Sequence, residues 1–120
     1  MRNKPGYSIF KNGSYALQGL LSAFKTETSF KLEIFFGILL TAAILVLNLP
    51  FYEKVLLFIT LILIPVVELL NSAVENLVDL VTRETHPLAK NAKDMGAAAV
   101  LLTLLLHIGC WIAILCKEFC

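Results

Sequence analysis

The distribution of apolar residues divides this chain into three long hydrophobic runs. They cover residues 34–49, 55–82 and 96–116, and charged residues enter only the second half of the middle run. Because a helix needs about 20 mostly apolar residues to cross the hydrocarbon core of a bilayer, these runs predict three membrane-spanning helices. The first run is slightly short for a span unless Phe30 and Leu32 extend it.

A different pattern precedes the first run. Between residues 7 and 25, apolar side chains recur at helical spacing and alternate with polar ones such as Lys11, Gln18 and Lys25. This pattern is typical of an amphipathic helix, which either lies on the membrane surface or packs against the rest of the protein. Between the helices we expect a polar hinge at 26–33, a turn at 51–54 and a polar loop or broken helix at 83–94.

Composition supports this fold class. The chain has 120 residues, of which 58% are hydrophobic and 16% charged, and its mean hydropathy is +0.82. This is more apolar surface than a soluble core of that size could bury, so we predict an all-α integral membrane protein with a single domain, 1–120. The three cysteines have no metal-binding spacing and are interpreted as apolar filling of the last span.

The positive charges predict an orientation. Of the ten lysine and arginine residues, all except Lys54 and Lys117 lie before the first run or between the second and third runs. Cytoplasmic loops are enriched in these residues, so we expect the N-terminal helix and the 83–94 segment to face the cytoplasm. For the glutamates beside Lys25 and Lys31, Glu27 and Glu33, a solvated surface pair is the simpler interpretation from spacing alone.

A polar stripe occupies the second half of the middle run. On a helix at about 100° per residue, the other polar side chains fall within roughly 60° of Glu68. An ionised carboxylate at bilayer depth costs several kcal/mol or more unless it is paired, hydrated or metal-bound. The stripe is therefore a candidate site, and it consists of Glu68, Asn71, Ser72, Glu75 and Asp79.

These residue types permit phosphoryl transfer to an alcohol in the membrane. Mg²⁺ prefers oxygen ligands and commonly uses one or two carboxylates plus substrate phosphates, a description that Glu75 and Glu27 fit. Glu68 lies deeper and is a candidate general base, while Lys93 and Arg83 are candidates for binding phosphates. The glycine-rich and catalytic-loop motifs of soluble kinases are missing from the sequence. The residues alone leave an ion-conducting or structural helical bundle equally open.

Two runs of sequence resemble a known family. ELLNSAVENLVD at 68–79 and ETHPLAKNAKDMGAAAV at 84–100 are similar to the signature of the prokaryotic diacylglycerol kinase family, which also includes undecaprenol kinases. TETSFKLE at 26–33 and YALQGLLSAF at 15–24 match as well. The resemblance implies a homotrimeric kinase of the bacterial inner membrane, with its active site facing the cytoplasm, that uses MgATP to phosphorylate a lipid alcohol.

The resemblance also implies roles for individual residues. Glu68 would be the general base, and Glu27 and Glu75 would hold the metal. The nucleotide would contact Tyr15, Glu27, Glu75, Glu84, His86, Lys93 and Asp94, with Asn71 and Asp79 supporting the site. The lipid side would include Glu33, Glu68, Ala97 and Trp111. Expected partners are ATP, a membrane lipid alcohol and further copies of the chain, and no nucleic acid.

The lipid itself is less firmly indicated than the reaction. AKDMGAAAV at 92–100 is similar to the diacylglycerol branch of the family, whereas HPLAK at 86–90 is similar to the undecaprenol branch. Ala97 stands where many members have a serine, and Leu17 and Gln18 replace a common tryptophan and lysine. We expect diacylglycerol to be the acceptor, with undecaprenol as the alternative.

Overall fold

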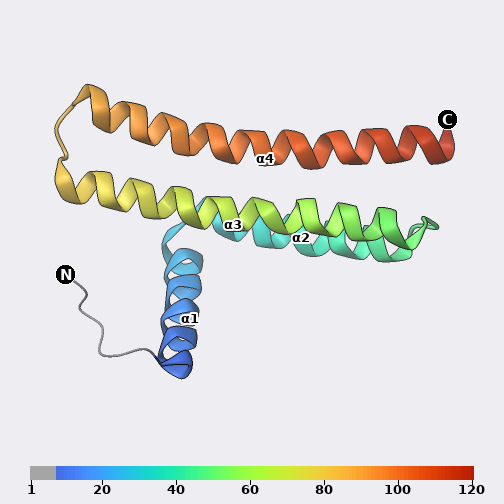
Figure 1. Ribbon diagram of the computed structural model, residues 1–120, viewed down its shortest axis with the longest axis horizontal. Coiled ribbons are helices and arrows are strands. Elements are labelled where there is room, and N and C mark those ends of the chain that lie inside the picture. The colour runs from blue at the N-terminus through green and yellow to red at the C-terminus, as the bar shows by residue number, and fades with distance from the viewer. Residues whose placement is uncertain (1–7) are drawn as a thin grey trace.

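The computed structural model describes residues 8–120, which form four helices. They are α1 (Ile9–Thr26), α2 (Thr28–Val46), α3 (Phe51–Val81) and α4 (Pro87–Phe119). Helices α2, α3 and α4 run side by side along the long axis of the molecule, whereas α1 lies across that direction, nearer the end where α3 connects to α4 (Figure 1). The expected all-helical architecture, with an N-terminal helix and three spans, is confirmed. Tyr7, where we expected the first helix to begin, lies outside the described residues.

All three long helices are apolar enough to cross a membrane, with 19, 31 and 33 residues. At 1.5 Å per residue, α3 and α4 are each about 45–50 Å long, so they exceed a hydrocarbon core of about 30 Å. Helix α3 packs against α1, α2 and α4, whereas the α2 and α4 backbones do not approach each other within the described chain. The middle helix, which carries the polar stripe, is therefore also the central one.

The connections are shorter than the sequence pattern indicated. Glu27 alone separates α1 from α2, so residues 28–33 are helical and not a hinge. The 51–54 segment is the first turn of α3 and not a turn between helices, because the amide N–H groups of Glu53 and Lys54 both donate to the Pro50 carbonyl. These polar segments were misassigned because hydrophobicity marks the membrane boundary, and helices of this length continue beyond it.

The third connection is short for an identifiable reason. Helix α4 begins at Pro87, much earlier than the expected start of the third span at residue 96. A proline at the first helical position loses no intrahelical hydrogen bond, and the His86 ring caps the helix by accepting from the Leu88 amide at 3.1 Å. Pro87 therefore starts a helix here, while α3 ends at Val81, close to the expected Thr82.

The buried core lies in the half of the bundle away from α1. Its members come from α2, the following turn, α3 and α4, and they are Ile44, Leu49, Leu57, Leu61, Ile64 and Ile114. Most other apolar side chains of α2 and α4 are exposed. Such faces suit a lipid environment, where an exposed leucine carries no penalty. Polar residues, by contrast, interrupt the packing at the other half of α3.

Candidate functional site

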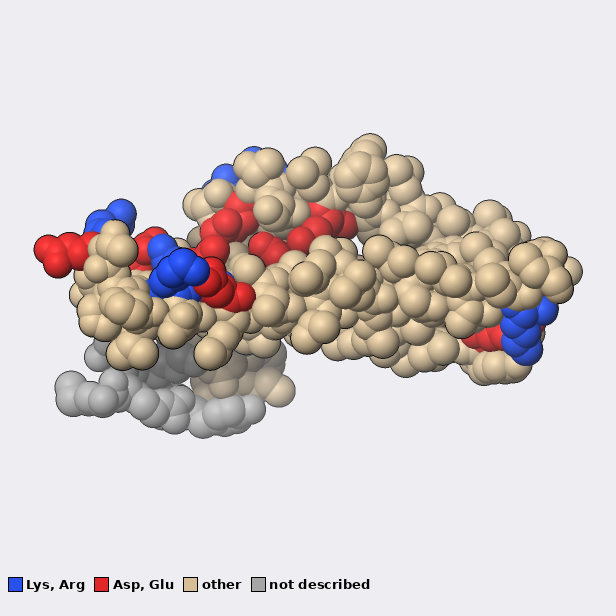
Figure 2. Space-filling model, turned by 90° about the horizontal axis from the view of Figure 1, so that it is seen from above, with Lys and Arg blue, Asp and Glu red and all other residues tan. Residues whose placement is uncertain are grey.

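The polar stripe of α3 faces the inside of the bundle. Glu68 is only 7% exposed and Ser72 is also buried, whereas Asn71, Glu75 and Asp79 are half-buried. Figure 2 shows acidic side chains gathered in a furrow in one half of the face in view. A buried carboxylate among apolar side chains is costly unless it serves a function, so this region is the candidate site.

Glu68 lies beside a second carboxyl group, that of Glu33. The two side chains are close enough to act on each other electrostatically, and the charges of Glu75 and Glu27 also act on Glu68. Glu33 is in the second turn of α2, and Glu27 is the residue that joins α1 to α2. The short connection between these helices therefore brings two glutamates to the stripe, separated by 35 residues or more from Glu68 in the sequence.

The surface-pair interpretation of Glu27 and Glu33 is not what the geometry favours. Within residues 8–120 the ion pairs are Lys90–Asp94, Lys93–Asp79, Lys117–Glu53 and Lys117–Glu118. Neither Glu27 nor Glu33 takes part in one of them. Glu33 Oε1 is buried and has no hydrogen-bond partner in the described part of the chain. An acceptor left in this state is available to a ligand that brings a donor.

Within the described part of the chain, cavities lie along the stripe and beside Glu33. The first, of about 570 Å³, is almost entirely apolar, lies between α2, α3 and α4, and has Glu33 on its wall. The second, of about 560 Å³, lies between α1 and α3 and is lined by Glu27, Ser72 and Asn76 among others. It also includes Ala16, the residue after the predicted nucleotide contact Tyr15. The site thus joins an apolar space to a polar one.

The third cavity, of about 320 Å³, is charged. It is formed by the end of α3, the following loop and the start of α4, and it collects five of the predicted site residues, Asp79, Glu84, His86, Lys93 and Asp94. The Lys93 ammonium donates to Asp79 Oδ1 at 2.7 Å, and Lys90 donates to Asp94 Oδ2 at 2.6 Å. Both lysines are thereby held where an anionic group could replace a carboxylate partner.

Close packing of α3 and α4 supports the stripe from the side. Gly96 touches the side chain of Asn71, and a Cβ at residue 96 would lie 3.2 Å from Asn71 Cγ. Asn71 Oδ1 and the Ser72 hydroxyl are buried and have no partner among residues 8–120. Ala97, the next residue along α4, is exposed. The small residues at the start of the third run therefore do permit close helix approach at Gly96, as the sequence indicated.

Trp111 is not brought to the carboxylates. Its indole N–H donates to His107 Nε2 at 2.9 Å, and it packs against the buried core in the other half of the bundle. Among the described residues, no group of three or more His, Cys, Asp or Glu side chains could hold a metal ion by itself. The prediction that Glu27 and Glu75 hold Mg²⁺ requires only two protein ligands, since Mg²⁺ commonly takes only one or two carboxylates.

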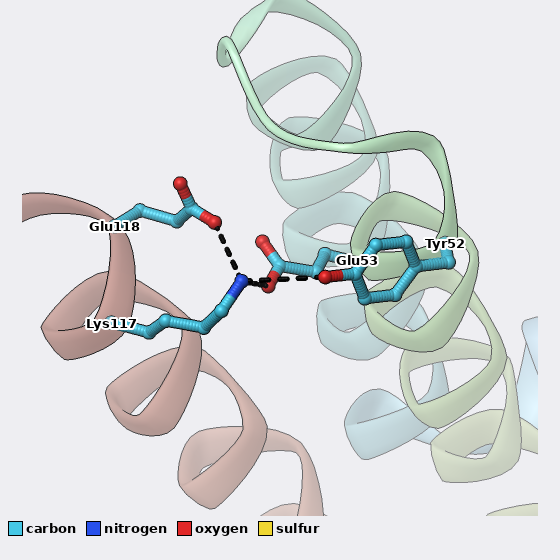
Figure 3. A network of polar contacts seen from close by, with 4 residues as sticks. All are labelled: Tyr52, Glu53, Lys117 and Glu118. Carbon is cyan, nitrogen blue, oxygen red and sulfur yellow. Dashed lines mark hydrogen bonds and ion pairs between the residues drawn. The ribbon is translucent and has the colours of Figure 1, made fainter.

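Two polar groups escaped the sequence analysis. One is the buried pair of Thr60 and His107, which lie 2.8 Å apart in the middle of the spans. The other is a network at the far ends of α3 and α4, where Lys117 contacts Glu53, Glu118 and Tyr52 (Figure 3). Polar residues inside apolar runs signal the first group, and charged residues just outside the ends of two runs signal the second. The helix pairing that joins such residues cannot be read from spacing.

The fold and the site together define a small multi-pass membrane protein with a carboxylate cluster between an apolar cavity and a charged one. Comparisons with known proteins assign the class. The family model described as "Prokaryotic diacylglycerol kinase" matches residues 14–115. The chain therefore belongs to the prokaryotic diacylglycerol kinase family, a family of membrane-embedded lipid kinases, as the sequence signature indicated.

Individual relatives agree with this assignment. The chain is 41% identical to the diacylglycerol kinase of Pseudomonas aeruginosa over 107 residues, which cover 89% of this chain and 87% of the relative. It is 41% identical to that of Haemophilus influenzae over 96 residues, with 80% and 81% covered. It is 35% identical to that of Escherichia coli K12 over 121 residues, with 98% and 97% covered. The similarity extends over nearly the whole chain and includes the stripe.

Proposed function

We propose that this protein transfers the terminal phosphoryl group of ATP to the free hydroxyl of diacylglycerol and so forms phosphatidic acid. The observation that carries the proposal is the position of Glu68, a buried carboxylate beside Glu33, and Glu33 in turn lies on the wall of an apolar cavity. A lipid alcohol needs such a combination, since its tail requires apolar surroundings and its hydroxyl needs a proton acceptor. The names of the relatives support the same acceptor.

In this proposal Glu68 is the general base. The diacylglycerol oxygen forms a bond to the terminal phosphorus, the bond from that phosphorus to ADP breaks, and the hydroxyl proton passes to Glu68. Such transfers depend mainly on positioning and on neutralising the phosphate charges. Asn71 and Asp79 support the site on either side, because Asn71 packs against Gly96 and Asp79 holds Lys93.

The phosphates require cations, and we assign Mg²⁺ to Glu75 and Glu27. The fit rests on donor chemistry, since both side chains offer carboxylate oxygens, both act electrostatically on Glu68, and neither is in an ion pair within residues 8–120. When bound, Mg²⁺ would offset phosphate charge and orient the transferred group. Lys93, His86, Glu84 and Asp94 line the charged cavity for the nucleotide, and Ala16, the residue after Tyr15, lines the α1–α3 cavity.

The remaining parts of the proposal concern assembly and location. We propose a homotrimer in the bacterial inner membrane, with α1 and the α3–α4 loop on the cytoplasmic side, where ATP is present. Support comes from the lysine and arginine distribution and from the extensive exposed apolar faces of α2 and α4, which suit lipid or further copies of the chain. Ala97 and Trp111 stay assigned to the lipid side by sequence similarity.

A direct assay tests the reaction and the acceptor. Purified protein in mixed micelles receives labelled ATP and either diacylglycerol or undecaprenol. We expect labelled phosphatidic acid, and we expect Glu68→Gln to lower turnover by roughly 100-fold or more. Glu118→Gln, an identical change at the opposite end of the bundle, is the matched control and keeps its turnover.

Two outcomes would contradict the proposal. Glu68 is not the base if its glutamine variant retains more than about a third of wild-type turnover. A kcat/KM for undecaprenol tenfold above that for diacylglycerol, about 1.4 kcal/mol in transition-state stabilisation, would reassign the acceptor and leave the kinase intact. The alternative of an ion-conducting or structural bundle predicts no labelled lipid.

A further inference from the structure

A chain of three polar side chains crosses from α3 to α4 in the middle of the membrane-spanning region. Thr60 Oγ1 lies 2.8 Å from His107 Nδ1, and the Trp111 indole nitrogen lies 2.9 Å from His107 Nε2. Thr60 and His107 are each only 4% exposed. Polar residues this deep in a span usually mark a functional position.

The chemistry of the three groups fixes the direction of these hydrogen bonds. An indole N–H can only donate, so His107 Nε2 must accept and the ring proton must be on Nδ1. The Nδ1–H then donates to Thr60 Oγ1, and the Thr60 hydroxyl donates to the backbone carbonyls of Leu56 and Leu57, at 3.1 and 3.0 Å. Every donor in the chain has an acceptor, and the imidazole is held neutral and in one orientation.

This oriented imidazole lines the apolar cavity. Its neighbours on that wall include Leu104 and Ile108 of α4 and Phe58 and Leu61 of α3, and Glu33 lies at the other end. Thr60 precedes Glu68 by eight residues on the same helix, so His107 is about 12 Å below the candidate base. A lipid with its hydroxyl at Glu68 and one acyl chain in this cavity would reach His107 only with the middle of a long chain.

We propose that His107, held by Thr60 and Trp111, is a specificity-determining residue that forms the deep wall of the acyl-chain cavity. The inference rests on the proposed function, which supplies the lipid and the place of its hydroxyl. A polar ring can line an apolar cavity only while its own hydrogen bonds are satisfied. Breaking the network turns an unsatisfied N–H or ring nitrogen toward the methylene groups and makes the cavity less favourable for a long chain.

Chain length separates this role from a structural one. We compare 1,2-dioleoylglycerol, whose chains pass His107, with 1,2-dibutyrylglycerol, whose chains end well above it. Thr60→Val and Trp111→Phe remove one hydrogen-bonding group each, and both should raise the KM for dioleoylglycerol on the order of fivefold. The kcat, the KM for MgATP and the KM for dibutyrylglycerol should stay within about twofold of wild type.

Two further variants serve as controls. Thr60→Ser keeps the hydroxyl and should restore the wild-type KM. Thr103→Val removes a hydroxyl from α4 that, within residues 8–120, bonds only the Val100 carbonyl of its own helix, at 2.7 Å, and should leave the KM for both lipids unchanged. An equal rise in KM for the two lipids would overturn the proposal in favour of a purely structural network, and so would an unchanged KM for dioleoylglycerol.

A binding measurement gives an answer that does not need turnover or a variant. Trp111 is the single tryptophan of the chain, so emission excited selectively from tryptophan reports on this network. Without ATP, dioleoylglycerol should change the emission saturably, and dibutyrylglycerol should not. If the emission responds in this way but the separate assay with ATP yields no phosphorylated lipid, the proposed function is refuted and the acyl-chain site is kept. No difference between the two lipids would refute the acyl-chain site and leave the kinase reaction unaffected.

Discussion

Gly96 of α4 lies directly against the side chain of Asn71 of α3, with no space for a methyl group between them. A Cβ at residue 96 would lie 3.2 Å from Asn71 Cγ and even closer to the amide oxygen. Asn71 is three residues from Glu68 on the same helix, almost one full turn. This close approach of the two longest helices therefore constrains the position of a polar group near the candidate base.

Gly96→Ala should consequently reduce both stability and activity. The added methyl forces Asn71 to rotate or the helices to separate, and overpacking of this kind costs about 1–3 kcal/mol. Gly109→Ala is the matched control on the same helix, because a methyl group at residue 109 would meet nothing within 4 Å, and alanine favours a helix by up to about 1 kcal/mol. Thermal midpoints of the two variants should thus move in opposite directions. A Gly96→Ala protein as stable as wild type would contradict the contact.

Glu75→Gln and Glu27→Gln should raise the Mg²⁺ concentration that gives half-maximal activity. Each variant removes a carboxylate from a site that commonly uses one or two, so we expect an increase of roughly tenfold or more. Titration of activity with Mg²⁺ at fixed ATP measures the effect. Glu118→Gln again serves as the control. An unchanged Mg²⁺ dependence in the Glu27 variant would remove Glu27 from the metal site without affecting Glu75.

Asp79→Asn should weaken the binding of MgATP. Asp79 holds the Lys93 ammonium at 2.7 Å on the wall of the charged cavity, and an asparagine keeps the shape but loses the charge that orients Lys93. We expect the KM for MgATP to rise roughly three- to tenfold, with little change in the KM for the lipid. Lys93→Met should raise the KM for MgATP further, because it removes the ammonium group that is proposed to bind the phosphates. If either variant instead raised the KM for the lipid more than the KM for MgATP, the Asp79–Lys93 ion pair would not belong to the nucleotide site.

Hydrophobicity predicted the fold because three apolar runs admit few arrangements in a membrane. The spans and the N-terminal helix follow from composition and periodicity, and so does the polar stripe, since Glu68 and Glu75 are conspicuous in an apolar helix. The ends of the helices were predicted less accurately from the sequence pattern. In the sequence, Pro87 indicates the end of the preceding helix, yet proline is also a favourable first residue of a helix. Only the structure shows that α4 begins at Pro87.

The site was predictable only in part, because spacing describes one helix at a time. Periodicity places Glu68 and Glu75 on one face, but it cannot show that Glu33 of α2 adjoins Glu68. For Glu33 the nearby lysines instead suggested a surface pair. The contact between Thr60 and His107, which are 47 positions apart, likewise depends on how α3 and α4 pair. Long-range packing of this kind has no local signal in the sequence.

The last prediction concerns the ends of α3 and α4 farthest from the site. Glu53 is 4% exposed and its Oε2 accepts from the Lys117 ammonium at 2.9 Å, while Lys117 also contacts Glu118 at 3.0 Å and the Tyr52 hydroxyl at 3.3 Å (Figure 3). Lys117→Met should lower the thermal midpoint, because it leaves a buried carboxylate without its cation. The kinetic constants should stay near wild type, since the network is remote from Glu68.

Two comparisons make this prediction specific. Lys90→Met breaks the exposed Lys90–Asp94 pair, whose side chains are 74% and 62% exposed, and its midpoint should change much less because water screens such pairs. The double variant Glu53→Gln/Lys117→Met should recover much of the stability lost by Lys117→Met, since replacing both partners leaves no unpaired charge. If the two changes instead add, the ion pair does not join the ends of α3 and α4, and the burial of Glu53 has another cause.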